Sequence, residues 1–279
     1  MKKGWNGNLA RVWTKMVGPS RPTISELAVY SKYAKLIQNN SNHKLKLLVL
    51  GSTPEFRDWG YENNFEITVM DCNSDYHEEI FREIRHKCIR EQYLCQRWQD
   101  LNEIEKYDII IGDLAIGNIP PSELEDFIIR VSKALTSNGL FLGKSFYHNK
   151  SYIPPTPENL VLNYYQGPPW HPYSAFAYDL TINCIDENNM LSFQKQYNLL
   201  VDLLDRGILK KETFDYFEDV GWNKDMKFLF HVPDLDSYES ILNKYMTIYS
   251  VEYGDDVYSK NFPLHIVGKK NNTLFKKEH

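Results

Sequence analysis

The chain has 279 residues, of which 42% are hydrophobic and 25% charged, and it carries a net charge of −5. This composition is typical of a globular protein with one large domain, and no apolar run reaches the roughly 18 to 20 residues that a membrane helix needs. The acidic balance argues against a nucleic-acid partner. Because the first residues lack the apolar stretch of a secretory signal, we expect a cytoplasmic protein. The four cysteines lack metal-binding spacing, which predicts buried free thiols and no metal site.

A helical segment is predicted near the amino end, over residues 21–38. Thr23 and Glu26 have the spacing of a capping box. Apolar residues then recur at helical spacing, at Leu27, Tyr30, Ala34 and Ile37. We therefore expect residues 1–42 to form a helical arm that packs on the rest of the protein.

Short apolar runs alternate with amphipathic segments in the next hundred residues. Strands are predicted over 44–50, 66–71, 107–113 and 139–146. Helices are predicted over 73–88, capped by Asn73 or Ser74, and over 122–135, with Ser122 and Glu125 as a capping box. This alternation predicts an α/β fold with a doubly wound, mostly parallel, Rossmann-like sheet, and it places the core at residues 43–150.

The composition changes after the fourth predicted strand. Six of the thirteen prolines lie between Pro154 and Pro172, among many aromatic residues. We expect residues 151–215 to form an aromatic and proline-rich insertion, either a lid over the site or a surface excursion with its own small core. Residues 216–279 are predicted to supply late strands, over 227–232 and 262–270, that complete the sheet of a single domain.

Two residues at predicted strand ends indicate a ligand site. Gly51 follows the first strand, and Asp71 ends the second, twenty residues later. Ligands of open α/β sheets bind beyond the carboxyl ends of the strands, where glycine allows a close approach and a carboxylate can accept both hydroxyls of a ribose. In the alternative interpretation, Gly51 only permits a turn and Asp71 only caps the next helix.

The loop after Gly51 indicates which nucleoside would bind. It has no further glycine, and it places Pro54, which lacks a backbone donor, and the negative charge of Glu55 where a pyrophosphate would lie. A nucleoside with a positive or zwitterionic tail is therefore favoured. Asp113, at the end of a later strand, would add a second acid beside that tail.

Five segments, in order, resemble the successive motifs of class I S-adenosylmethionine (SAM)-dependent methyltransferases: LLVLGSTPEFRD, EITVMD, WQDL, YDIIIGDLAI and LTSNGLFLGKSF. The first resembles the branch whose loop reads Gly-x-Thr-Pro-Glu, and RPTISELAVYSKYA is similar to the arm that this branch places over SAM. The resemblance implies the following contacts: Gly51, Ser52, Thr53 and Glu55 border the methionine part, Asp71 binds the ribose, Trp98 and Asp100 border the adenine, and Asp113 lies near the methionine end. Trp98 also suits a core position.

Methyl transfer from SAM requires mainly that the acceptor be aligned and water excluded. A hydroxyl acceptor would gain from a general base, for which Tyr147, His148 and His171 are candidates. Since no basic groove is evident, a small molecule or peptide metabolite is the expected substrate. Two alternatives remain open: a SAM-binding sensor or partner protein without activity, and a nucleotide-dependent oxidoreductase.

Overall fold

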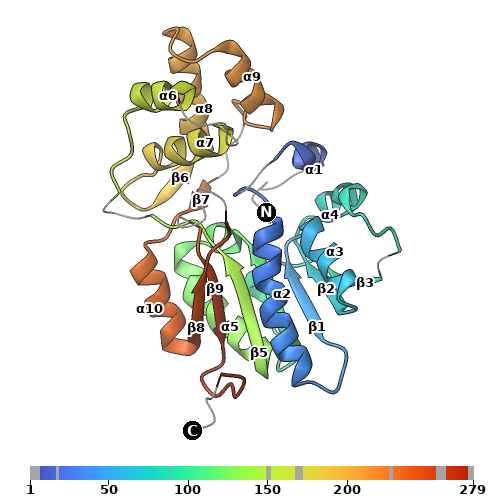
Figure 1. The fold of residues 1–279 in the computed structure, drawn as a ribbon. Helices are drawn as coiled ribbons and strands as arrows, with labels where there is room; N and C mark the ends of the chain where they lie inside the picture. Colours follow the sequence, from blue (N-terminus) through green and yellow to red (C-terminus); the bar gives the residue numbers. More distant parts are fainter. Residues whose placement is uncertain are drawn as a thin grey trace.

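A computed structural model of the chain describes residues 7–16, 19–88, 90–148, 152–166, 172–225, 229–255 and 262–275. Its centre is a seven-stranded sheet with the order β3-β2-β1-β4-β5-β9-β8 (Figure 1). The strands are β1 (Lys46–Leu50), β2 (Glu66–Met70), β3 (Glu91–Leu94), β4 (Tyr107–Asp113), β5 (Leu135–Lys144), β8 (Thr247–Glu252) and β9 (Leu264–Gly268). The first five are parallel, whereas β9 runs antiparallel to both β5 and β8. The predicted doubly wound, mostly parallel sheet is confirmed.

Helices cover both faces of the sheet (Figure 1). One face carries α2 (Ile24–Asn39) and α3 (Pro54–Glu62), and the other carries α5 (Leu124–Ala134) and α10 (Leu235–Tyr245). Because side chains alternate along a strand, successive β1 residues enter opposite layers: Leu47 and Val49 pack under α2 and α3, and Leu48 and Leu50 under α5.

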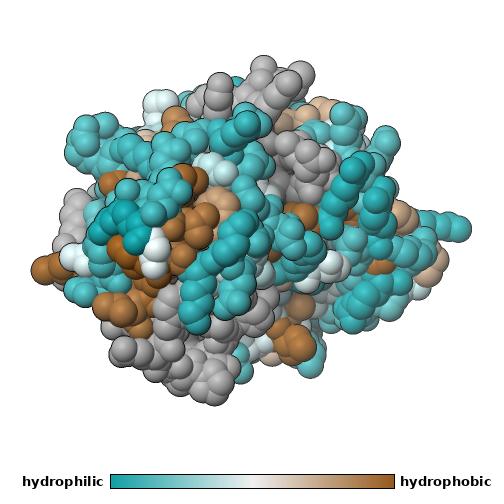
Figure 2. Space-filling view, turned by 90° about the horizontal axis from the view of Figure 1, so that it is seen from above, coloured by the Kyte–Doolittle hydropathy of each residue, from teal (hydrophilic) through white to brown (hydrophobic). Residues whose placement is uncertain are grey.

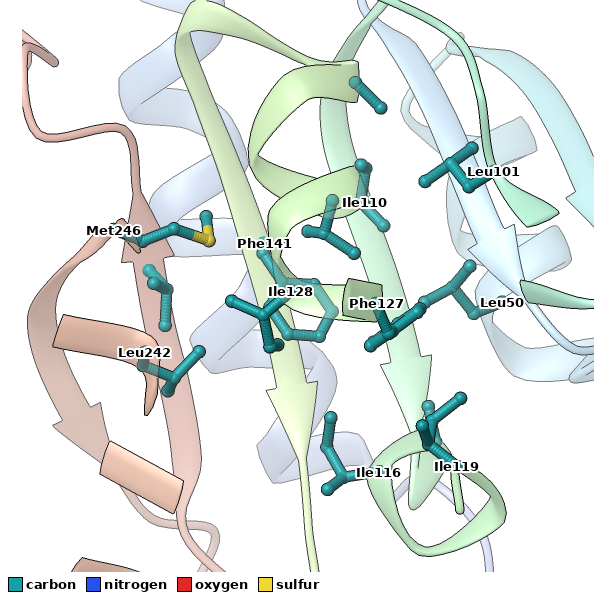
Figure 3. Packing of buried hydrophobic residues seen from close by; sticks show 14 of the residues in the cluster. Leu50, Leu101, Ile110, Ile116, Ile119, Phe127, Ile128, Phe141, Leu242 and Met246 are labelled. Atoms are coloured by element: carbon teal, nitrogen blue, oxygen red, sulfur yellow. The ribbon is translucent and has the colours of Figure 1, made fainter. Parts of the chain in front are cut away.

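The layer between the sheet and helices α5 and α10 is a continuous apolar core (Figure 3). Ile110 and Phe141 project from strands β4 and β5 toward Phe127 and Ile128 of α5, and all four are fully buried. Burying one such side chain contributes about 1.5 to 3 kcal/mol. This core fixes the strand ends on which the site residues sit.

The arm helix was predicted correctly, but two other helix boundaries were not. In α2 the Thr23 side chain accepts from the Glu26 amide and Glu26 bonds back, which confirms the capping box. Helix α4 (Ser74–Ile80) is capped by Asn73 as predicted but ends well before residue 88, in a 3₁₀ turn over Phe81–Glu83. The predicted Ser122 capping box of α5 is wrong, because a 3₁₀ turn that begins at Pro121 leads directly into that helix.

The late strands differ partly from the expectation. The 262–270 segment forms β9, beside β5, but β7 (Leu229–His231) pairs with β6 (Met190–Ser192) in a separate two-stranded sheet. The place expected for the 227–232 segment is taken by β8, whose half-buried residues do not form the continuous apolar run by which strands were predicted. Short β3, with a polar sequence at the other sheet edge, was missed for the same reason.

Four helices form a cap beyond the carboxyl ends of the parallel strands (Figure 1). They are α6 (Pro157–Gln166), α7 (Pro172–Asn183), α8 (Phe193–Asp205) and α9 (Lys211–Asp219). The cap has its own apolar core, which includes Leu160, Leu180, Leu200, Leu203 and Phe217. Seen from this end, the described surface is mostly hydrophilic, with apolar side chains gathered in a patch (Figure 2).

The amino-terminal arm touches both the cap and the core. Its first helix, α1 (Gly7–Val12), packs with Trp13 against α4 in a small cluster around Tyr76 and Ile80. Lys15 then reaches the cap, where its Nζ lies 3.3 Å from Asp219 Oδ2. The arm therefore links the cap to the sheet.

The structure also describes the cysteines and the apolar character of the helices. All four cysteines are free, but Cys72, Cys88 and Cys95 are exposed, so the prediction of buried thiols holds only for Cys184. Within the described ranges, none of the helices combines the length and the apolar character needed to cross a bilayer.

Candidate functional site

The chain changes direction in the sheet between β1 and β4. From β1 it proceeds outward to β2 and β3, and from β4 outward to β5, so the crevice beyond β1 and β4 is the expected ligand position. Gly51 lies at this point with a φ of +91°, and a Cβ there would lie 3.2 Å from the Trp98 ring. The backbone conformation therefore favours glycine, and any Cβ would in addition press on the neighbouring indole.

Asp71 lies beside Gly51, directly after β2. Its Oδ2 accepts the Ser52 amide at 3.1 Å, and its Oδ1 accepts the Asn73 amide at 2.9 Å. Burial raises the pKa of Asp71, whereas these hydrogen bonds and the Arg57 charge oppose the shift. The Ser52 side chain is a third donor to this carboxylate. Because a carboxylate has about four acceptor positions, one is left for a ribose hydroxyl. Asn73, not Asp71, caps the following helix, so a capping role does not explain the acid.

Side chains of the amino-terminal arm hold the loop after Gly51 in place. Ser52 and Thr53 are both buried, and α3 begins at Pro54. Glu55 Oε1 receives Arg21 Nε at 2.8 Å, Arg21 Nη2, and Trp13 Nε1 at 3.1 Å. The other oxygen, Glu55 Oε2, is buried and has no hydrogen-bond partner among the described residues. One carboxylate oxygen of Glu55 thus binds the arm, and the second oxygen can still accept a hydrogen bond.

A buried lysine joins the arm to the strand ends. Lys144, at the end of β5, lies with its Nζ 2.9 Å from Glu26 Oε2 and 3.1 Å from Asp113 Oδ1, and it donates to the Arg21 carbonyl at 3.3 Å. Burial raises the pKa of Asp113 to about 7, against the opposing effect of Lys144. The two carboxylates outweigh the burial of Lys144 and raise its pKa, so the ammonium stays charged.

Sequence reasoning did not assign this lysine, although a signal was present. Lys144 stands in the apolar run GLFLGKSF of a strand that is buried on both faces. A charge in such a run requires partners, and Asp113 and Glu26 are the acids that supply them.

The residues assigned to the adenine end follow β3 in the 3₁₀ turn Trp98–Asp100. Trp98 Nε1 donates to the Met70 carbonyl at 2.7 Å, and its half-buried ring packs against the core below α5. The Asp100 side chain is 58% exposed and lies 3.8 Å from Arg97. The structure thus places Trp98 both beside Gly51 and on the core, and Asp100 at the rim.

The three candidate bases lie in different surroundings. Tyr147 is buried, its hydroxyl lies 3.1 Å from His265 Nδ1, and burial raises its pKa well above the usual value. His148 turns toward the cap side, with Nδ1 3.1 Å from Asn189 Oδ1. His171 lies outside the described residues. His265, fully buried and 3.0 Å from Glu239 through Nε2, is a contact that sequence reasoning missed.

A depression of about 470 Å³ lies elsewhere on the surface. Its polar walls include Gln38, His43 and Asn64, beside the amino end of β1, and no predicted site residue lines it. The depression therefore lies at the opposite end of β1 from Gly51 and the other predicted ligand-binding residues.

No protein-family model matches the chain, and no curated protein matches it. Solved structures share its fold. A SAM-dependent methyltransferase from Clostridium acetobutylicum is 11% identical, with a TM-score of 0.55 over 94% of this chain and 98% of that chain. A Pyrococcus horikoshii protein is 13% identical, with a TM-score of 0.53 over 92% and 98%. A Rhodobacter sphaeroides protein described as a Zn-dependent alcohol dehydrogenase is 13% identical, with a TM-score of 0.57 over 95% and 99%.

These similarities define the fold of the chain. Its strand order, with β9 antiparallel at the β5 edge, and its flanking helices are those of a class I SAM-dependent methyltransferase fold. The methyltransferase fold that the resemblance implies is thereby confirmed.

Proposed function

We propose that the protein binds SAM across the ends of β1, β2 and β4 and transfers its methyl group to a small molecule or peptide metabolite. The observation that carries this proposal is the Asp71 carboxylate, which two backbone amides hold beside Gly51 and which keeps acceptor capacity for a ribose hydroxyl. The methyltransferase fold, shared with the Clostridium acetobutylicum enzyme, supports it.

The remaining predicted contacts suit the zwitterionic methionine part of SAM. Glu55 Oε2 is a buried oxygen with no described partner, and Asp113 is a second buried acid at the neighbouring strand end. Acidic oxygens in this position suit an ammonium group and disfavour a pyrophosphate. Ser52 and Thr53 complete the methionine side, and Trp98 and Asp100 are proposed to border the adenine.

When bound, SAM supplies a methyl group on a positively charged sulfur. The chain's own residues would orient it and exclude water. The cap, which the arm joins to the strand ends, is proposed to cover the acceptor. Tyr147, His148 and His171 remain the proposed bases for an acceptor that must lose a proton.

The first loop favours this function over dinucleotide-dependent oxidation. Pro54 takes the first helical position of α3, and Glu55 adds a negative charge behind it. Dinucleotide sites instead use several glycines and free amides at this position. In the part of the chain that the structure describes, no three His, Cys, Asp or Glu side chains gather as metal ligands.

The proposal is tested by calorimetric titration of SAM and its demethylated product, S-adenosylhomocysteine (SAH), into the wild type and Asp71→Asn. Hydrogen bonds to a charged group contribute about 1.5 to 3 kcal/mol each, so we expect the variant to bind roughly 10- to 100-fold more weakly. Asp75→Asn, at an exposed acid of the next helix, is the matched control. Equal affinity of the Asp71 variant and the wild type would refute the assignment of the site.

A further inference from the structure

Tyr30 of the arm helix α2 carries a buried hydroxyl that the fold itself does not use. The residue is 1% exposed, and its ring packs edge-on against Phe56 of α3, with the ring centroids 5.9 Å apart. The hydroxyl oxygen has no hydrogen-bond partner among the described residues. Native proteins pair nearly all of their buried polar atoms, so this hydroxyl is suited to a partner that a ligand brings.

The Tyr30 hydroxyl belongs to the group of acids at the strand ends. Tyr30 follows Glu26 by four positions in α2, which places both side chains on the same face of the helix. Lys144 joins Glu26 to Asp113 on that side, with Nζ 2.9 Å and 3.1 Å from their oxygens. Burial raises the pKa of Tyr30 well above its usual value, and the Glu26 and Asp113 charges raise it further. The phenol therefore stays neutral, with one proton to donate and lone pairs that can accept.

The charges of this cluster do not balance. Its carboxylates are Glu26, Glu55 and Asp113, and its cations are Lys144, which contacts Glu26 and Asp113, and Arg21, which binds Glu55. These groups come from the arm, α3 and the ends of β4 and β5. When all five are ionised, one negative charge stays uncompensated in a buried place, which is unfavourable. A proton on Asp113, whose pKa burial raises to about 7, removes that charge.

The free acceptors of the cluster match an ammonium group. The Tyr30 hydroxyl and Glu55 Oε2 are both buried and unpaired in the part of the chain that the structure describes. The Asp113 carboxylate keeps acceptor positions besides its contact with Lys144. An ammonium has three N–H donors, one for each of these three groups. Its charge would also neutralise the cluster, as the proton on Asp113 does.

We propose that Tyr30 is a ligand-binding residue of the site, and that a ligand ammonium bound by Tyr30, Glu55 and Asp113 takes the place of a proton on Asp113. This inference rests on the proposed function, in which the ammonium belongs to the methionine part of SAM. As the ammonium enters, Asp113 releases its proton to solvent. The Tyr30 oxygen accepts from the ammonium, and its own proton is free for the carboxylate of the same amino-acid group.

Tyr30→Phe tests the hydroxyl alone, because it keeps the ring against Phe56. Since the hydroxyl has no protein partner, the melting temperature of the variant should stay unchanged or rise. Its SAH affinity, measured by calorimetry, should fall about two- to tenfold, as the loss of one hydrogen bond would cause. Tyr107→Phe is the matched control. It removes another buried hydroxyl that lacks a partner among the described residues, but at the amino end of β4, so SAH affinity should equal that of the wild type.

The proton release is measured by titrating SAH into the wild type at pH 6.5 in phosphate and in imidazole buffer. The difference in heat between the two buffers should correspond to roughly 0.5 to 1 proton released per ligand. SAH affinity should rise roughly ten- to thirtyfold from pH 5.5 to pH 7.5 as Asp113 ionises. Asp113→Asn resembles the protonated acid, so it should release no proton and bind at both pH values with the low-pH affinity of the wild type.

Either test can overturn the inference. Equal SAH affinity of Tyr30→Phe and the wild type, with or without a loss of stability, would assign the hydroxyl to the fold alone. Binding without proton release, or an unchanged pH dependence in Asp113→Asn, would show that the ammonium does not replace that proton. If the wild type binds neither SAM nor SAH, the proposed function falls and this ligand role falls with it. If the wild type binds SAH and either test fails, only the inference falls.

Discussion

Replacing Lys144 by methionine is expected to destabilise the protein strongly. The lysine side chain is 1% exposed, and its ammonium lies between the carboxylates of Glu26, on the arm, and Asp113, on β4. Methionine has a similar length but no charge. Lys144→Met therefore leaves two buried acids facing each other without a cation.

The size of the effect follows from this geometry. Removing one partner of a buried ion pair costs about 3 to 5 kcal/mol, which corresponds to a fall of roughly 10 °C in melting temperature for a chain of this size. The variant should lose less at low pH. Without Lys144, the folded-state pKa of Asp113, which burial already raises, rises further above its unfolded value, so the penalty is fully present at high pH and is relieved as Asp113 takes up a proton.

The assay is urea unfolding followed by tryptophan fluorescence at pH 8 and pH 5. Lys32→Met is the control, because Lys32 also binds an acid, Glu252, at 3.1 Å, but is 66% exposed, and exposed pairs contribute about 0 to 1 kcal/mol. Adding Glu26→Gln and Asp113→Asn to Lys144→Met should restore part of the stability. If Lys144→Met loses no more than Lys32→Met at pH 8, the buried cluster does not hold the arm as described.

Gly51→Ala should lower the free energy of unfolding by about 1 to 2 kcal/mol for its left-handed φ, with an added penalty from the Trp98 ring. Gly207→Ala is the control, because Gly207 has a φ of +69° but no atom within 4 Å of the new Cβ. Its free energy of unfolding should fall by less. Equal losses of the two variants in urea unfolding would contradict the packing of Trp98 on Gly51. Burial raises the folded-state pKa of Asp113 to about 7, above the unfolded value of about 3.9. Folded protein therefore binds an extra proton between these values, and stability falls as pH rises through that window. Asp113→Asn should flatten this dependence between pH 5 and 8, and an unchanged slope would show that Asp113 is not the group responsible.

The sequence alone determined the layered core and the strand ends. Short apolar runs that alternate with amphipathic helical segments predict a parallel sheet with helices on both faces. This prediction needs only the spacing of apolar residues, which can be read from neighbouring positions in the chain. Gly51 and Asp71 could be placed at neighbouring strand ends for the same reason, and the structure brings them together through Ser52. Polar or half-buried edge strands such as β3 and β8 carry no such pattern.

Only the tertiary structure decided which charges meet. Glu26 and Lys144 are 118 positions apart, and Ser52 and His77 are 25 apart, yet each pair is within hydrogen-bond distance. No local period encodes these contacts, because they depend on how the arm and α4 dock against the sheet. Burial then sets the protonation of Asp113 and His77, and burial is a property of the packed molecule.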